Sequence, residues 1–301
     1  ELSPGSDLDI LILHSGQYSD EELLAFVNAM LYPIWDGATS GIDLPRSVDH
    51  SVRTRSETRD AARTDLKVAM GLLDIRLICG DAELVADVQH DAYDDWRKDA
   101  RKRLLQLRAL LEQRHERAGE LAYLLEPDLK EARGGLRDIN ALRAIAASGA
   151  VDVPLDRIRR AELILNGIRE ALHTKSGRPR DRLLFQEQDR VATTLKYADA
   201  DALMGDVAQS ARDVDYLMNL TWHRFTHRGK DGLGRFLRRP RTITVAGGIS
   251  VAHQEVVIDV DAPSADDPIL GLRAAATAAQ LGLPLSLDSS LLLSRSIKEG
   301  Y

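Results

Sequence analysis

The sequence predicts an α+β fold that is predominantly helical, in which a small α/β domain precedes a helical domain. Aromatic residues make up 5% of the 301 residues, whereas Ala, Leu and Arg, which favour helices, are abundant. Strand patterns occur only near the two ends of the chain. We therefore expect a first domain over residues 1–81 and, over residues 82–301, a helical-bundle domain with a small β-hairpin.

The first domain is expected to hold two strands with helices around them. Leu8 to Leu13 is continuously apolar and predicts a strand buried on both faces. Val48 to Arg53 alternates apolar with polar residues and predicts a second strand. Cys79 lies in an apolar run, so we expect a small core residue there. Helical patterns, the first opened by acidic residues, cover residues 20–33, 56–63 and 65–77.

The second domain is expected to be helical apart from one hairpin. Gly247-Gly248, within Thr242 to Val260, suits a tight turn, with Val256 to Ile258 in the return strand. His90-Asp91 precedes a long amphipathic pattern and is interpreted as loop and helix cap. Helical periodicity covers residues 93–125, 136–147, 155–173, 180–195, 200–226, 267–281 and 286–296.

A pair of carboxylates marks the start of the first strand, in the motif Gly5-Ser6-Asp7-Leu8-Asp9. Carboxylates two residues apart on a strand project from one face, and like charges that close favour a cation between them. Mg²⁺, or Mn²⁺ in its place, is the natural occupant because it prefers oxygen ligands and substrate phosphates. The alternative is an ordinary turn with an Asx hydrogen bond.

A third carboxylate can join this pair from the second strand. Asp49 lies on the polar face of that strand and can reach Asp7 and Asp9 if the two strands are neighbours. Arg53, further along the same face, would then point at phosphates. Asp43, in the loop before the strand, competes with Asp49 for this position.

Two basic segments in the helical domain are candidates for contact with phosphates. Gly134-Gly135 places backbone amides at a helix N-terminus, and Lys130, Arg133 and Arg137 surround it with positive charge. The alternative is a capped loop between helices with solvated charges. The second segment comprises Arg169, His173, Lys175 and Gly177 to Arg182. Its positive charge could bind phosphates or an acidic partner protein, and the alternative is a solvated surface.

The composition argues against several classes of protein. The net charge is −7, with 40 Lys and Arg residues, so no basic excess points to nucleic acid as the main partner. No apolar segment reaches the length of a membrane span. A single cysteine excludes a disulfide framework within the chain and suits a reducing cytoplasm.

Several segments together resemble one family, the bacterial PII uridylyltransferase/uridylyl-removing enzymes. They are Glu1 to Asp9, Trp35-Asp36, His50 to Thr54, Leu124 to Ile139, and Gly177-Arg178 followed by Asp181 to Phe185. The resemblance covers nearly the whole chain, and the order and spacing of the motifs are more specific than Asp-x-Asp alone. Glutamine synthetase adenylyltransferases share Asp-x-Asp and a Gly-Gly-x-Arg-Asp-Ile segment. They lack the His-Ser-Val-Arg-Thr run, so they rank second.

The resemblance implies a fold and an activity. It implies a polymerase-β-type nucleotidyltransferase domain whose phosphate-binding glycine pair lies upstream of Glu1, a helical companion domain, and hydrolase and ACT domains beyond Tyr301. The activity is transfer of UMP from UTP to a tyrosine of the PII nitrogen-regulatory protein, with release of pyrophosphate. Some relatives transfer AMP from ATP instead, and the sequence does not decide the base. The alternative function is that of a non-catalytic regulatory domain that has kept the fold. Such a domain would be expected to have lost the carboxylates, but Asp7, Asp9 and Asp49 are all present.

The resemblance also implies roles for individual residues. Asp7, Asp9 and Asp49 would be catalytic and hold the metal, although many members have Gly in place of Asp49. The residues implied to contact the nucleotide are Ser6, Arg53, Lys130, Gly134, Gly135 and Arg137.

Overall fold

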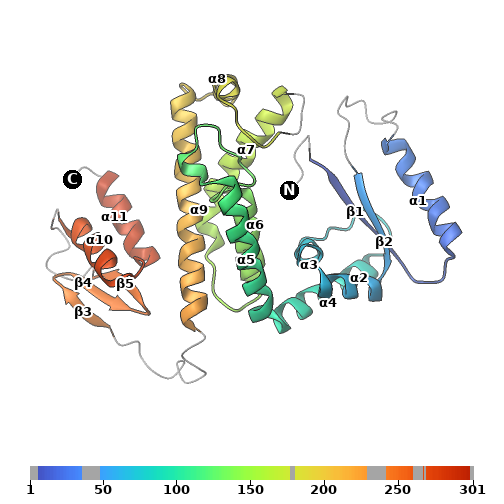
Figure 1. Cartoon of the computed structure of the whole chain (residues 1–301), viewed down its shortest axis with the longest axis horizontal. Coiled ribbons are helices and arrows are strands. Elements are labelled where there is room, and N and C mark those ends of the chain that lie inside the picture. Colours follow the sequence, from blue (N-terminus) through green and yellow to red (C-terminus); the bar gives the residue numbers. More distant parts are fainter. Residues whose placement is uncertain are drawn as a thin grey trace. The chain divides into compact units, whose positions relative to one another are not determined.

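The computed structural model describes residues 6–35, 48–176, 180–228, 242–259, 267 and 269–298. Helices dominate it, with one two-stranded and one three-stranded sheet, which confirms the predominantly helical α+β class (Figure 1). Its contacts divide the chain into two compact units, Glu1–Asn219 and Leu220–Tyr301, so the division falls inside α9 (Ala200–Arg228). The domain boundary expected near residue 81 stays a prediction.

The first unit begins with two parallel strands, β1 (Leu8–His14) and β2 (Val48–Thr54). Both strands lie where the sequence predicts them, but the residues of β1 are partly buried or exposed, so the expectation that this strand is buried on both faces is wrong. The helix α1 (Asp20–Trp35) follows β1 and begins at its acidic turn, where the side chain of Glu22 accepts the Ser19 amide at 2.8 Å. The helix contains Pro33 rather than ending there.

Helix α2 (Arg55–Thr64) continues β2 without an intervening loop. Thr54 and Glu57 form a capping box: the Glu57 amide donates to the Thr54 hydroxyl at 3.2 Å, and the Thr54 amide donates to the Glu57 carboxylate at 2.7 Å. Helix α3 (Leu66–Leu72) starts at the side-chain cap of Asp65 and ends earlier than expected. Cys79 therefore lies beyond the helix and is exposed, so its prediction as a core residue is wrong.

The expected long helix is two helices, α4 (Ala82–Lys98) and α5 (Ala100–Ala118), which meet at Asp99. The first begins at Asp81, whose side chain accepts the amides of Glu83 and Leu84. The sequence analysis overlooked this cap. His90-Asp91 therefore lies inside α4, and its interpretation as loop and cap is wrong.

The core of the first unit is built by the remaining helices, as their apolar periodicity predicts. Ile139, Leu142 and Ile145 of α6 and Leu165 and Leu172 of α7 are almost completely buried. Full burial of one such side chain stabilises the fold by about 1.5–3 kcal/mol. The elements are η1 (Leu121–Tyr123), α6 (Leu136–Ala147), η2 (Leu155–Ile158), α7 (Arg159–Ser176), α8 (Phe185–Thr194) and α9.

The second unit contains an antiparallel sheet of β3 (Ile243–Ala246), β4 (Ile249–Ala252) and β5 (Glu255–Ile258). The turn at Gly247-Gly248 is confirmed, but residues 256–258 belong to a third strand rather than to the return strand. A second tight turn precedes that strand, with positive φ at His253 (56°) and Gln254 (62°), residues that do not signal such a turn. Helices α10 (Leu270–Leu281) and α11 (Leu287–Lys298) complete the unit.

Candidate functional site

The parallel pairing of β1 and β2 brings two of the predicted carboxylates together. Asp9 and Asp49 are direct Cα partners in the register, so their side chains leave the sheet on the same face. Asp7 lies two residues before Asp9, just ahead of β1. All three residues are exposed, and none of their side chains has a hydrogen bond or ion pair with another described residue. Three acids without a cationic partner among the described residues therefore lie near one end of the strand pair.

The carboxylate oxygens of these residues are of the kind that Mg²⁺ prefers. Within the described ranges, no three His, Cys, Asp or Glu side chains are placed to hold a metal ion together. The three-carboxylate metal site thus stays a prediction. Asp43 lies outside the described residues, whereas the register supports Asp49. Arg53 follows Asp49 by four residues on the same face of β2, and Ser6 directly precedes Asp7.

The backbone amides of Gly134 and Gly135 are already bonded within the protein. Gly134 donates to the Asp138 carboxylate at 2.6 Å, and Gly135 donates to the Ala132 carbonyl at 2.9 Å. Gly134 has φ +86°, and a Cβ there would stand 2.5 Å from the Ala211 carbonyl oxygen. Close packing against α9 therefore explains a glycine at this position. A contact of either glycine with nucleotide stays a prediction.

The cations of the same loop are tied to acids at the surface. Lys130 Nζ lies 3.7 Å from Asp181 Oδ2, and Arg137 Nε lies 2.9 Å from Glu131 Oε1. Side-chain exposure is 35% for Lys130 and 47% for Arg137, so both pairs face solvent and contribute little stability. A phosphate ligand would have to displace these acids to bind the two cations, and the predicted contact with nucleotide stays a prediction.

Asp138 is a buried carboxylate that the sequence analysis did not single out. Its side chain is fully buried and accepts hydrogen bonds from Arg114, from His115 Nε2 at 2.9 Å and from the Gly134 amide. Arg114 and His115 belong to α5, so this network joins α5 to the start of α6. Its signal in the sequence is the acid that follows Gly-Gly-x-Arg.

The second basic segment also holds the fold together where it is described. Arg169 Nε and His173 Nε2 lie 2.6 and 3.1 Å from Asp181 Oδ1. Burial alone would raise the pKa of Asp181, but the hydrogen bonds from His173 and Arg169 outweigh it and hold that pKa well below its usual range. The Leu129 amide donates to the Asp181 carbonyl at 2.8 Å, so the two helical-domain motifs contact each other.

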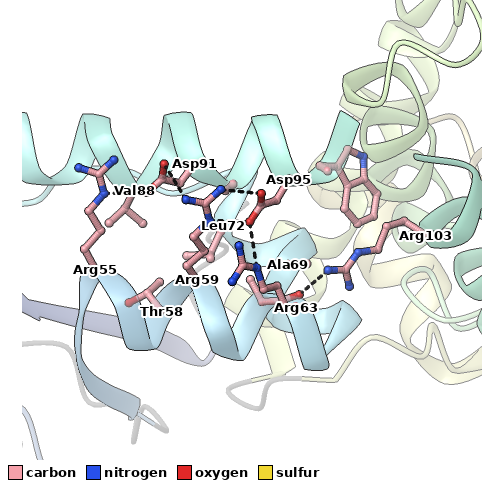
Figure 2. Close-up of a pocket in the computed structure, with 13 residues that line it drawn as sticks. Arg55, Thr58, Arg59, Arg63, Ala69, Leu72, Val88, Asp91, Asp95 and Arg103 are labelled. Atoms are coloured by element: carbon pink, nitrogen blue, oxygen red, sulfur yellow. Dashed lines mark hydrogen bonds and ion pairs between the residues drawn. The ribbon is translucent and has the colours of Figure 1, made fainter. Parts of the chain in front are cut away.

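A row of ion pairs between α2 and α4 was not predicted. We call it the arginine–aspartate ladder, and Figure 2 shows its arginines pointing from α2 toward the acids of α4. Both helices repeat one residue type every fourth position, a spacing that places the residues on one face and could have revealed the ladder. It consists of Arg55, Arg59 and Arg63 on α2 and of Asp87, Asp91 and Asp95 on α4.

Comparison with known proteins gives the family. Residues 101–149 and 152–222 match the model of the family described as GlnD PII-uridylyltransferase. A bifunctional uridylyltransferase/uridylyl-removing enzyme of Streptomyces coelicolor is 46% identical over 95% of this chain and 35% of its own length. The enzyme of the same name from Mycobacterium tuberculosis is 33% identical over 99% of this chain and 37% of its own length. The chain belongs to the GlnD PII-uridylyltransferase family.

The chain spans little more than a third of the length of these relatives, so it corresponds to one part of a longer family architecture. No solved structure matches it. Across the described ranges, every helix is too short or too polar to cross a bilayer.

Proposed function

We propose that this chain carries the nucleotidyl-transfer site of its family. The reaction is transfer of UMP from UTP to a tyrosine hydroxyl of a PII signalling protein, with release of pyrophosphate. The observation that carries the proposal is the register of β1 and β2, which sets Asp9 opposite Asp49 at the exposed end of the strand pair. The names of the relatives and of the family support the uridylyl group and the PII substrate.

The mechanism follows from the charges of the reactants. Asp7, Asp9 and Asp49 would hold Mg²⁺, and this ion would supply positive charge for the triphosphate and lower the pKa of the attacking hydroxyl. The tyrosine oxygen attacks the α-phosphorus in line with the leaving pyrophosphate, and Asp49 accepts the hydroxyl proton. Negative charge grows on the phosphoryl oxygens, and Arg53, which shares the face of Asp49, stabilises it electrostatically.

The two helical-domain cations would act on the same nucleotide. Lys130 and Arg137 are partly exposed, and their described ion-pair partners are Asp181, which is mostly buried, and Glu131, which is partly exposed, so phosphate can compete for both cations. We place the reaction in the cytoplasm, since the single cysteine suits a reducing compartment.

The test offers the chain a PII protein with UTP or ATP in Mg²⁺ and reads the mass of PII. A gain of one UMP per modified subunit, lost when the PII tyrosine is replaced by phenylalanine, is the expected result. A gain of AMP would keep nucleotidyl transfer but change the base. Unmodified PII with either nucleotide, from a chain that binds Mn²⁺–UTP normally, would contradict the proposal.

A further inference from the structure

The candidate carboxylate Asp49 is joined to the helical domain by an unbroken series of short contacts. Strand β2 passes directly into α2, and the Thr54–Glu57 capping box fixes the junction. A strand and a helix that share a rigid junction move as one body. Any group that holds α2 therefore also holds β2, which carries Arg53 next to this junction and Asp49 at its far end.

The arginine–aspartate ladder holds α2 along the face that it turns toward α4. Arg59 donates to both oxygens of Asp95 at 2.7 Å, a bidentate contact that fixes direction as well as distance. Arg55 pairs with Asp87 and, at 2.6 Å, with Asp91. Arg55 and Arg59 hold the pKa values of Asp91 and Asp95 below their usual range, so the acids stay charged at neutral pH.

The far end of α2 is held by a buried cation. Arg103 of α5 is 5% exposed, and its Nη2 donates to the Ala62 carbonyl in the last turn of α2 at 2.9 Å. A guanidinium at a helix C-terminus also complements the helix dipole. Figure 2 shows Arg103 at the end of the ladder, beside Arg63 and Ala69.

Helix α4 is in turn bonded to α6 through two side chains that donate hydrogen bonds to its carbonyl groups. Trp96 is 1% exposed, and its indole Nε1 donates to the Ala144 carbonyl of α6 at 2.8 Å. Arg97 donates to the Ala147 carbonyl at 3.3 Å. Helix α6 begins directly after Gly134-Gly135 and carries Arg137, so it belongs to the second predicted half of the nucleotide site.

We propose that the arginine–aspartate ladder is a positioning element that sets the carboxylates of the strand pair against the cations of the 130–137 loop. This inference rests on the proposed function, because it assumes that both halves contact one nucleotide. Neither Arg59 nor Asp95 touches the reactants. Their ion pair instead decides whether the metal and the cations meet the same triphosphate, since small misplacements of reacting groups lower rates steeply.

The kinetic test separates position from binding. Arg59→Glu faces Asp91 and Asp95 with like charge, so kcat should fall by about ten- to a hundred-fold. Affinity for Mn²⁺ alone should not change, because the carboxylates are intact. The double variant Arg59→Glu/Asp95→Arg restores an ion pair of reversed direction and should recover most of kcat. Arg157→Glu is the matched control, since it reverses an arginine that pairs with the exposed Asp156 in η2, and it should behave as wild type.

A distance measurement tests the ladder without using activity. Spin labels replace Tyr18 and Leu163, which are 58% and 68% exposed, in a chain whose Cys79 is changed to Ser. A narrow distance distribution in the parent chain, broadened by Arg59→Glu and narrowed again by the double variant, is expected. A broad distribution in the parent, or no response to Arg59→Glu, would overturn the proposal.

The two tests also separate this proposal from the proposed function. An inactive parent chain with a narrow, ladder-dependent distribution would refute nucleotidyl transfer and leave the ladder as the element that places the two parts. An active parent chain whose kcat is unaffected by Arg59→Glu would support nucleotidyl transfer and overturn the positioning role of the ladder.

Discussion

Asp9 and Asp49 on the strand pair are exposed and have no side-chain partner among the described residues, whereas Asp138 of α6 is fully buried and accepts hydrogen bonds from three groups. The strand carboxylates are neighbours on one face of the sheet. Their mutual repulsion stabilises neither the strands nor the pairing between them. The α6 carboxylate is surrounded by donors that compensate its loss of hydration. Residues of one chemical type thus serve two purposes in one chain.

The difference indicates where binding energy is available. A buried carboxylate whose hydrogen bonds are all made within the protein stabilises the fold, so its removal lowers the free energy of unfolding. Exposed carboxylates that lack partners among the described residues can still bind a ligand, so we expect their removal to lower ligand affinity rather than stability. The predictions below test this distinction.

Removal of Asp138 should cause the largest loss of stability. Asp138→Ala leaves Arg114 as a buried charge without its counterion, which costs about 3–5 kcal/mol. Chemical denaturation measures the free energy of unfolding. Glu112→Ala, which breaks a surface pair between Arg108 and Glu112 on α5, is the control and should change it by less than about 0.5 kcal/mol. Equal small effects from both variants would refute the structural role of Asp138.

Gly134→Ala should have the next largest effect. The added Cβ would stand 2.5 Å from the Ala211 carbonyl oxygen at a φ of +86°, so we expect a loss of about 2 kcal/mol or more. Gly205→Ala in the same helix as Ala211 is the control: it meets open space and should stabilise the chain by about 0.5–1 kcal/mol. If Gly134→Ala instead weakened UTP binding at unchanged stability, its amide would belong to the nucleotide site after all.

Acid should weaken the contacts of Asp181. The pKa of this carboxyl is lowered in the folded chain by His173 and Arg169, despite the opposing effect of burial. Its contribution to stability is therefore complete above about pH 4 and is lost as the pH falls below that value. Unfolding measured from pH 5 to pH 2 should show a shallower decline for Asp181→Asn than for wild type. Parallel declines would show that the carboxyl is not stabilised by its neighbours.

Much of the fold could be predicted from the sequence because the period of an apolar pattern distinguishes strands from helices. Leu8 to Leu13 and the alternation after Val48 identified both strands, and periodicity identified α6 to α9. The boundaries that failed depend on single capping residues: Asp81 starts α4 earlier, and Asp99 divides it from α5. The turn at His253-Gln254 depends on two residues with positive φ that carry no characteristic turn signal.

The strand positions of two candidate residues could be predicted from the sequence, whereas the surroundings of the candidate residues could not. The sequence placed Asp9 and Asp49 on strand faces, and the register sets them opposite each other. It offered Gly134 as an anion-binding amide, and only the folded chain reveals Asp138 as the acceptor of that amide. Such contacts join distant segments, and local patterns do not encode them.

Asp9→Asn should leave stability unchanged or raise it by up to about 1 kcal/mol, because it removes one of two opposed charges from an exposed strand face. Asp49→Asn should behave alike. Both variants should unfold as cooperatively as wild type, in contrast to Asp138→Ala.

The most direct test is a titration of Mn²⁺ into the wild-type chain and the Asp9→Asn variant in the presence of UTP, followed by paramagnetic resonance and by the mass of added PII. The proposed metal site predicts tight Mn²⁺ binding and uridylylated PII for the wild type, and loss of both for Asp9→Asn at unchanged thermal stability. Near-wild-type Mn²⁺ affinity and transfer by Asp9→Asn would contradict it.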